Sequence, residues 1–292
     1  PLWSRGLGDV YKRQALGGAI DYITRTGRDA DKLQLRYEAG SHGYQKRSIS
    51  SGQVLGDFDY YINVTDSSYD GYQDHASGKG KGVAANFGYR LNENLETRFY
   101  LRYRETEHEV PGRLSKAQIE HDPRAAAANN LRINAHRDQP GSTWLANKTT
   151  WQIDEDSTLV AGLAYHHYPM DIVENSSPNG NTYRVRVDYS DVSGTLNYTR
   201  RHSLFGLDST TTLGFRSTTN LPSSKSKENA ALPISVGGTD YPAGTLMRAY
   251  EHLGSDNVLH IGNETELAPD LWLTSGLAPV SYTHLRAHET RE

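Results

Sequence analysis

Histidine and carboxylate side chains gather in one polar stretch of the sequence, between residues 105 and 141. His108, His121 and His136 occur there among several glutamates and aspartates. Imidazole and carboxylate groups are common metal ligands, so this stretch could hold a metal ion or an iron chelate. A solvated loop of mixed charge explains the same composition and is the simpler interpretation. We therefore assign no resident metal site and no cofactor to the chain.

The other reactive residue types form no catalytic pattern. His166 and His167 would point to opposite faces of a strand, so they could not share a metal ion there. No glycine-rich phosphate loop, nucleophile elbow or paired-carboxylate motif occurs between a strand and a helix. The sequence has no cysteine, which removes thiol and disulfide chemistry. We expect no enzyme, and the net charge of -4 offers no basic field for nucleic acid.

Alternating apolar and polar residues predict β-strands throughout the interior. From Leu95 to Arg104, every second residue is apolar, threonine or tyrosine, and the residues between are mostly charged. Eleven such strands are expected, near residues 33–39, 45–54, 58–64, 83–89, 95–103, 149–153, 159–165, 183–198, 213–215, 259–261 and 271–273. In the eighth strand the alternation changes parity near Ser190 and Asp191, which predicts a β-bulge.

Short and long connections alternate between these strands. The short ones lie near residues 91–94, 154–157, 201–207 and 268–270. The long and polar ones span roughly 69–80, 105–141, 170–182 and 217–256. Outer-membrane barrels have short periplasmic turns and long extracellular loops, whereas a soluble sandwich has no reason to place every long loop at one end. The pattern therefore predicts an all-β, antiparallel transmembrane barrel.

The two faces of such strands require different surroundings. Mean hydropathy is -0.71, but a barrel strand needs apolar residues only at alternate positions. Lipid offers no hydrogen-bond partner, so the apolar series is expected to face outer-membrane lipid. Arg98, Arg102 and Arg184 are expected to face the lumen, because a lipid-facing Arg or Lys costs about 2–4 kcal/mol at the midplane. Tyrosines towards the strand ends would form the interfacial girdles, namely Tyr37, Tyr60, Tyr89, Tyr103, Tyr165, Tyr183 and Tyr198.

The two ends of the chain differ from its interior. Residues 1–14 share no pattern with the rest of the chain, and residues 279–292 interrupt a strand-like run and turn basic and polar. Both ends resemble translated sequencing-adapter read-through. We expect them to be non-native, with flexible native termini as the alternative.

Residues 15–29 carry a more specific motif. A Gly-Gly pair precedes a short β-branched run that ends at Gly27, and the motif residues are Gly17, Gly18, Ile20, Ile23 and Thr24. This segment resembles the C-terminal end of the plug domain in TonB-dependent receptors, where it leads into the first barrel strand. Asp21 and Tyr22 depart from the commoner asparagine-containing version, and Arg25 replaces a lysine.

Two further segments resemble the same family. Tyr69-Asp70-Gly71-Tyr72 is similar to a segment that often opens the second extracellular loop. Gly112-Arg113-Leu114, with Asp122-Pro123-Arg124 ten residues later, is similar to the third loop of the siderophore-receptor branch. The resemblance covers residues 15–278. It implies a plugged barrel of about 22 strands, of which residues 30–278 would supply the first eleven.

The resemblance also implies a function. TonB-dependent receptors take up large scarce solutes, usually ferric siderophores, across the bacterial outer membrane, with energy from the TonB complex acting on a part of the receptor outside this chain. Ligand contacts within the chain are expected from the loops, at Arg113, Arg132, His136 and Tyr241, since guanidinium and aromatic groups suit an anionic, aromatic chelate. A passive porin-type channel and a soluble β-rich adhesin or carbohydrate-binding module remain as alternatives.

Overall fold

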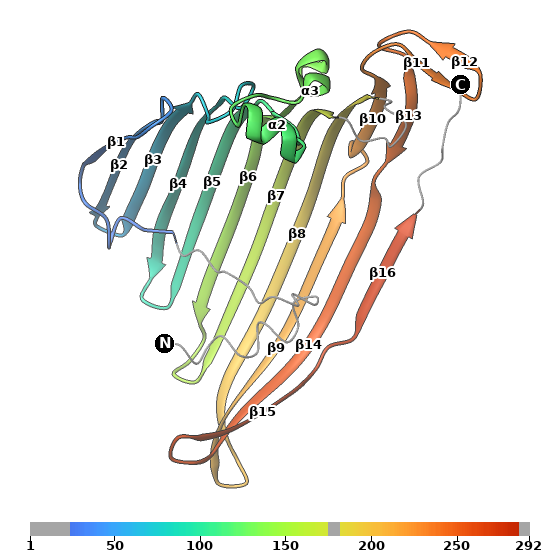
Figure 1. The fold of residues 1–292 in the computed structure, drawn as a ribbon. Coiled ribbons are helices and arrows are strands. Elements are labelled where there is room, and N and C mark those ends of the chain that lie inside the picture. Colours follow the sequence, from blue (N-terminus) through green and yellow to red (C-terminus); the bar gives the residue numbers. More distant parts are fainter. Residues whose placement is uncertain (1–23, 175–181, 286–292) are drawn as a thin grey trace.

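The computed structural model describes residues 24–174 and 182–285, in which fourteen strands form one large antiparallel sheet that curves like the wall of a barrel and two more form a separate hairpin (Figure 1). The first nine strands are β1 (Gln34–Ala39), β2 (Gln45–Leu55), β3 (Phe58–Tyr69), β4 (Gly78–Asn92), β5 (Leu95–His108), β6 (His136–Gln152), β7 (Ser157–Glu174), β8 (Tyr183–Leu204) and β9 (Leu207–Asn220). The others are β10 (Lys225–Ala230), β11 (Ile234–Val236), β12 (Thr239–Tyr241), β13 (Leu246–Glu251), β14 (Leu253–Ala268), β15 (Leu271–Leu277) and β16 (Val280–Leu285).

The order of strands across the sheet follows the order of the sequence. Eleven of them form the path β1 to β9, then β14 and β15, and every neighbouring pair is antiparallel. This confirms the predicted antiparallel barrel wall and its eleven strands. No helix in the described ranges is long and apolar enough to cross a membrane.

Short and long connections lie at opposite ends of the strands, as predicted. Only two residues separate β4 from β5 and β8 from β9, at one end of the sheet. At the other end, residues 109–135 hold two short helices, α2 (Lys116–His121) and α3 (Ala128–Ile133) (Figure 1). The last long connection contains β10 to β13, of which β10 pairs with β8 and with β13. The sequence predicted none of these additional elements.

The predicted bulge in β8 is wrong. The register between β7 and β8 runs without a shift from Ser157↔Arg200 to Glu174↔Tyr183. What changes near Ser190 is the second neighbour of β8. Residues 191–204 of β8 pair with β9, whereas residues 183–188 pair with β10. Arg184 therefore stays on the same face as Leu196, and its predicted luminal position is wrong as well. It pairs with Asp171 of β7 at 2.5 Å instead.

The outer face of the sheet, which carries Leu163 and Leu196, exposes large apolar side chains. Cross-strand neighbours form continuous apolar rows on it, for example Leu159, Tyr198, Leu213 and Ile261. Leu35, Phe99, Leu163, Leu213 and Leu259 are each between 47% and 69% exposed to solvent. A soluble protein does not leave so large an apolar surface uncovered. The opposite face, called the inner face, carries Asp59, Arg98 and Arg102.

Residues 280–285, which we expected to lie outside the native barrel, form β16. This strand pairs with the first part of β14, beside the pairing of β15 with the second part. The two short strands thus continue one edge of the sheet, separated at Ala278 and Pro279. The non-native origin of the end segment stays a prediction.

A small apolar core lies among the long connections. Ile133, Ala135 and Val173 are buried together, and Val110, Ala231 and Leu232 pack against them. These residues come from the helical connection, the end of β7 and the segment after β10. A capping box fixes the start of α2, where Ser115 and Gln118 satisfy each other's backbone N–H groups. The connections therefore form one packed rim, named the loop rim (residues 109–135, 173 and 231–232).

We predict that Ile133→Ala loosens the loop rim. Removing a buried Ile side chain costs about 2–5 kcal/mol, and Ile133 is 7% exposed. Amide hydrogen exchange should accelerate across residues 109–135 while β3 to β5 remain protected. Leu131→Ala in the same helix is the matched control, because Leu131 is 50% exposed. Equal acceleration in both variants would contradict this packing.

Candidate luminal site and its anchor

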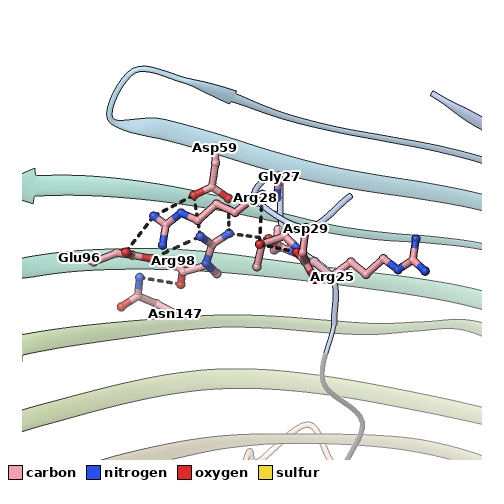
Figure 2. Close-up of polar contacts among 10 residues, drawn as sticks. Arg25, Gly27, Arg28, Asp29, Asp59, Glu96, Arg98 and Asn147 are labelled. Carbon is pink, nitrogen blue, oxygen red and sulfur yellow. Dashed lines mark hydrogen bonds and ion pairs between the residues drawn. The ribbon is translucent and has the colours of Figure 1, made fainter. Parts of the chain in front are cut away.

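The segment that leads into β1 lies against the inner face of the sheet. Residues 24–32, named the entry segment, form hydrogen bonds with β2, β3 and β4. The Gly27 N–H donates to Asp59 at 3.2 Å, and the Asn86 side chain donates to the Arg25 carbonyl at 2.7 Å. The Ser51 hydroxyl donates to the Lys32 carbonyl at 2.7 Å. The entry segment is thus held by side chains as well as by backbone (Figure 2).

A buried ion pair forms the centre of this anchor. Arg98 on β5 donates to both carboxylate oxygens of Asp59 on β3, at 2.8 and 2.7 Å. The two side chains are 7% and 1% exposed. Arg98 also donates to Asn86 on the intervening β4, at 2.7 Å. Bidentate arginine–carboxylate pairs are among the stronger polar contacts in proteins, because both hydrogen bonds are charge-assisted.

The anchor ties the entry segment to the ion pair through Arg28. Its guanidinium lies 3.1 Å from Asp59 and 2.9 Å from Glu96 (Figure 2). Glu96 in turn lies 3.3 Å from Arg98, so two arginines and two carboxylates alternate around one cluster. The cluster is neutral, and this arrangement offsets the desolvation of each charge.

Two glycines make this close packing possible. A Cβ at Gly88 would collide with the Arg98 guanidinium and the Asp59 carboxylate, which occupy the space beside it. A Cβ at Gly27 would collide with the backbone carbonyls of Gln53 and Tyr60. Gly27 therefore lets the backbone of the entry segment lie directly against the backbone of β2 and β3.

The predicted plug-end motif lies mostly outside the described residues. Gly17, Gly18, Ile20 and Ile23 precede residue 24, and only Thr24 is described, where it is exposed. The assignment of residues 15–29 to a plug domain stays a prediction. What the structure adds is the contact of the following residues with the wall.

A second group of side chains lies elsewhere on the inner face, across β5 to β8. We name it the wall patch, and it consists of Tyr100, Arg102, Trp144, His166, Tyr168 and Asp191. Register places Arg102 beside Trp144, Trp144 beside His166, and His166 beside Asp191. Four of the six side chains thus form one row across four strands, and Tyr100 and Tyr168 lie in the rows on either side of it.

Within the wall patch, cationic and aromatic groups contact each other. The Arg102 guanidinium lies 5.7 Å from the Trp144 ring centre, and the Tyr100 ring lies 6.2 Å from it. His166 lies 3.7 Å from an Asp191 oxygen, and its Nε2 is buried without a hydrogen-bond partner among the described residues. Such a surface can stack on a planar ligand and donate to an anionic one.

The long connections are joined to each other near the rim. Both the Ser77 hydroxyl and the Ser77 backbone N–H donate to Glu109, at 2.7 and 3.2 Å. The pKa of the Glu109 carboxyl is lowered from its ordinary value, mainly by the hydrogen bond from the Ser77 hydroxyl. The buried ring of His75 lies between Glu109 and the Ala135 carbonyl, at 3.3 and 2.8 Å.

The structure spreads the four predicted ligand residues over the loop end of the sheet. Arg113 precedes α2 and is exposed, and Arg132 on α3 donates to Asn129. His136 is the first residue of β6 rather than a loop residue, and its Nδ1 lies 2.7 Å from the Asn134 carbonyl. Tyr241 ends β12 in the β11–β12 hairpin. Across the described ranges, no hydrogen bond or ion pair joins any two of the four.

The histidines considered as possible metal ligands are also apart in the fold. His108 ends β5, His121 ends α2 and His136 begins β6. In residues 24–174 and 182–285, no three His, Asp or Glu side chains come together as a metal site would require. His166 and His167 take opposite faces, as predicted, since they pair with Asp191 and Asp188 respectively.

Sequence reasoning missed the partners of the anchor and most of the wall patch. It placed Arg98 and Arg102 on the inner face, which their register confirms. The signal that could have revealed the anchor was an aspartate and an arginine at inner positions of two strands, with Gly88 between them. Trp144 was missed because the sixth strand was expected only from residue 149, whereas β6 begins at His136.

Comparisons with known proteins identify the fold. No family model matches the chain, and no curated protein matches it by sequence. The structure is similar to solved outer-membrane receptors, so the expected fold, part of a receptor β-barrel, is confirmed. The proteins in these structures are named as receptors or transporters.

Three solved structures illustrate the similarity. The pyoverdine outer membrane receptor FpvA from Pseudomonas aeruginosa PAO1 superposes with a TM-score of 0.67 at 12% identity, over 90% of this chain and 42% of the receptor. The ferric-catecholate import receptor Fiu from E. coli K12 superposes with a TM-score of 0.65 at 13% identity, over 89% of this chain and 46% of the receptor. The ferric preacinetobactin receptor BauA from Acinetobacter baumannii superposes with a TM-score of 0.64 at 11% identity, over 91% of this chain and 44% of the receptor. This chain spans less than half of each receptor.

The buried ion pair can be tested with a double-mutant cycle on Asp59 and Arg98 in the full-length receptor. Asp59→Asn or Arg98→Met alone breaks the buried bidentate contact and leaves the remaining charge with one ionic partner, Glu96 or Arg28, so each should destabilise the barrel by up to about 3–5 kcal/mol. The double variant should lose less stability than the sum of the losses in the two single variants. Unfolding in urea, followed by heat-modifiable migration, measures the difference.

The exposed pair of Arg47 and Asp66 on the outer face provides the control for this cycle. Their side chains are 63% and 62% exposed, so the same substitutions should change stability by about 0–1 kcal/mol. Additive losses at Asp59 and Arg98 would show that the two side chains do not act as a pair.

Proposed function

We propose that the chain is part of a TonB-dependent receptor of the bacterial outer membrane, which takes up a large scarce solute of the ferric siderophore class. One observation carries this proposal. The sheet has an apolar outer face and a charged inner face, and the entry segment is bound to the inner face through Asp59 and Asn86. A segment anchored inside the wall suits a plugged receptor better than an open channel.

The physical basis for a membrane location is the outer face. Its exposed rows of Leu, Ile, Val, Phe and Tyr would be covered by hydrocarbon, and the backbone groups of neighbouring strands pair with each other across the sheet. A soluble adhesin or carbohydrate-binding module has no use for such a face. A passive porin-type channel would share it, but would have no use for the anchored entry segment.

The proposed ligand is an anionic, aromatic iron chelate. The receptors to which the fold is similar include one for ferric catecholates and one bound to ferripyoverdine, at 13% and 11% sequence identity. On this chain, the loop residues Arg113, Arg132, His136 and Tyr241 and the wall patch offer the matching chemistry, which is guanidinium and aromatic groups. Movement of the ligand through the barrel would require the TonB complex, acting on parts of the receptor outside this chain.

The loop contacts can be tested in the full-length receptor. Replacing Arg113, Arg132, His136 and Tyr241 by alanine together should weaken ligand binding and lower uptake of a radiolabelled iron chelate at limiting concentration. None of the four has a buried side chain, so the barrel should still assemble. Unchanged uptake would refute the assignment of these four residues, while leaving the receptor fold in place.

The wall patch gives a prediction with a matched control on the same strand. Trp144→Ala should weaken chelate binding severalfold, because the ring that contacts Arg102 and Tyr100 is lost. Trp151→Ala removes an indole of the same size from the outer face, where Trp151 is 46% exposed, and should leave binding unchanged. Fluorescence titration with the chelate measures both. Equal weakening would mean that the effect comes from the strand and not from the patch.

A further inference from the structure

Three cationic side chains on the inner face have no acidic partner. Lys46 on β2 and Arg102 and Arg104 on β5 form no ion pair within residues 24–174 and 182–285. Arg102 contacts the Trp144 ring instead, as described for the wall patch. Glu38 on β1 lies opposite Lys46 in register, but its carboxylate is 2.8 Å from Arg36. The charge of the three cations is therefore not balanced by the part of the chain that the structure describes.

The outer face of the same four strands balances its charge at this level. On the inner face, positions of β2 to β5 between the anchor and the loop end carry the three cations and no carboxylate. On the outer face, each of three cations faces a carboxylate of the neighbouring strand. The outer pairs are Lys79 with Glu107, Lys81 with Glu105 and Arg47 with Asp66, at 2.8, 2.8 and 3.6 Å.

The unpaired cations border an open hollow of about 340 Å³ in the inner face, named the luminal groove. Its floor is β4, where Gly80 and Gly82 occupy two successive inner positions and provide no side chain to fill the space between β3 and β5. Glycine inside a strand often marks a place where another group approaches the backbone closely. The side chains that line the groove include Lys46, Thr65, Ser67, Arg102, Arg104 and His108.

The luminal groove lies between the anchor and the loop end of the sheet. Along β5, Arg98 belongs to the anchor, Arg102 and Arg104 border the groove, and His108 ends the strand beside the long connections. Arg102 is also part of the wall patch, so the groove and the patch are continuous. A solute that enters from the loop end would therefore meet both surfaces before it reaches the entry segment.

The spacing of the cations favours an anionic ligand. Arg102 and Arg104 occupy successive positions on one face of a strand, so their Cα atoms are about 7 Å apart and their charges repel each other. A cleft lined by one sign of charge concentrates ions of the opposite sign. Guanidinium groups bind carboxylate and phosphate oxygens with paired, charge-assisted hydrogen bonds. An oxyanion in the groove would offset the repulsion between the two arginines.

We propose that the luminal groove binds an oxyanion group, a carboxylate or a phosphate, of the solute that the receptor takes up. This inference rests on the proposed function, which supplies the solute. The groove and the wall patch suit different parts of such a molecule, because the patch offers aromatic rings for stacking and the groove offers unpaired cations. A solute that contacts both would combine a planar part with a charged arm.

Calorimetric titration of the full-length receptor with citrate and with inorganic phosphate at low ionic strength tests the groove. Arg104→Gln should weaken binding of whichever anion binds by about tenfold, because a hydrogen bond to a charged group contributes binding free energy of this order. Lys81→Gln is the matched control, since it removes the same charge from the outer face. Gly80→Val keeps every charge but fills the groove, and should also weaken binding. A Cβ at Gly80 would come no closer than 3.3 Å to its neighbours, so the strand can accept it.

The variants separate the possible outcomes. Equal weakening by Arg104→Gln and Lys81→Gln would show that the anion responds only to net charge, which overturns the proposal. A wild-type receptor that binds neither anion would overturn it as well, whether the groove is empty or filled by another part of the receptor. The titration needs neither iron nor uptake, so it is independent of the proposed function. Citrate binding that depends on Arg104, in a receptor that takes up no iron chelate, would refute the proposed function and retain the anion site.

Discussion

Antiparallel register that holds through the body of the sheet, with shifts only towards strand ends, is the constraint on which the rest of this structure depends. Side chains alternate between two faces, so a single slip would move every apolar residue of a strand to the other side. Pairing between β7 and β8 continues over all 18 residues of β7 without such a slip. One face can therefore remain apolar and the other charged across the sheet, which allows a buried ion pair on the inner side and exposed leucines on the outer side.

The anchor shows what this constraint allows. Asp59, Asn86 and Arg98 lie on three neighbouring strands, and they meet because register brings inner positions of β3, β4 and β5 together. Their hydrogen bonds and those of Arg28 hold the entry segment against the wall. The same face that is polar enough for an aqueous lumen thus also binds the chain that enters it.

The sequence allowed the strands, their order and the end at which the long connections lie to be predicted, because period-two alternation is a local property. It did not reveal where the outer face stops being apolar. On the loop side of Ser190 the outer face carries Arg184 and Arg186, so a change from apolar to charged outer residues was mistaken for a bulge. The Asp59 and Arg98 pair depends on residues 39 positions apart, and such long-range partners leave no periodic signal. Ligand residues follow no pattern at all, so the assignment of Arg113, Arg132, His136 and Tyr241 stays a prediction.

The packed loop rim has a consequence for recognition. Ile133, Ala135 and Val173 hold segments from different connections in one body, so much of the rim is ordered before any ligand arrives. Ordering flexible loops on binding usually costs part of the interaction free energy, and a rim that is already ordered avoids that entropic loss. Chemical variation at exposed positions such as Arg113 and Arg132 can then alter selectivity without rebuilding the frame that supports them.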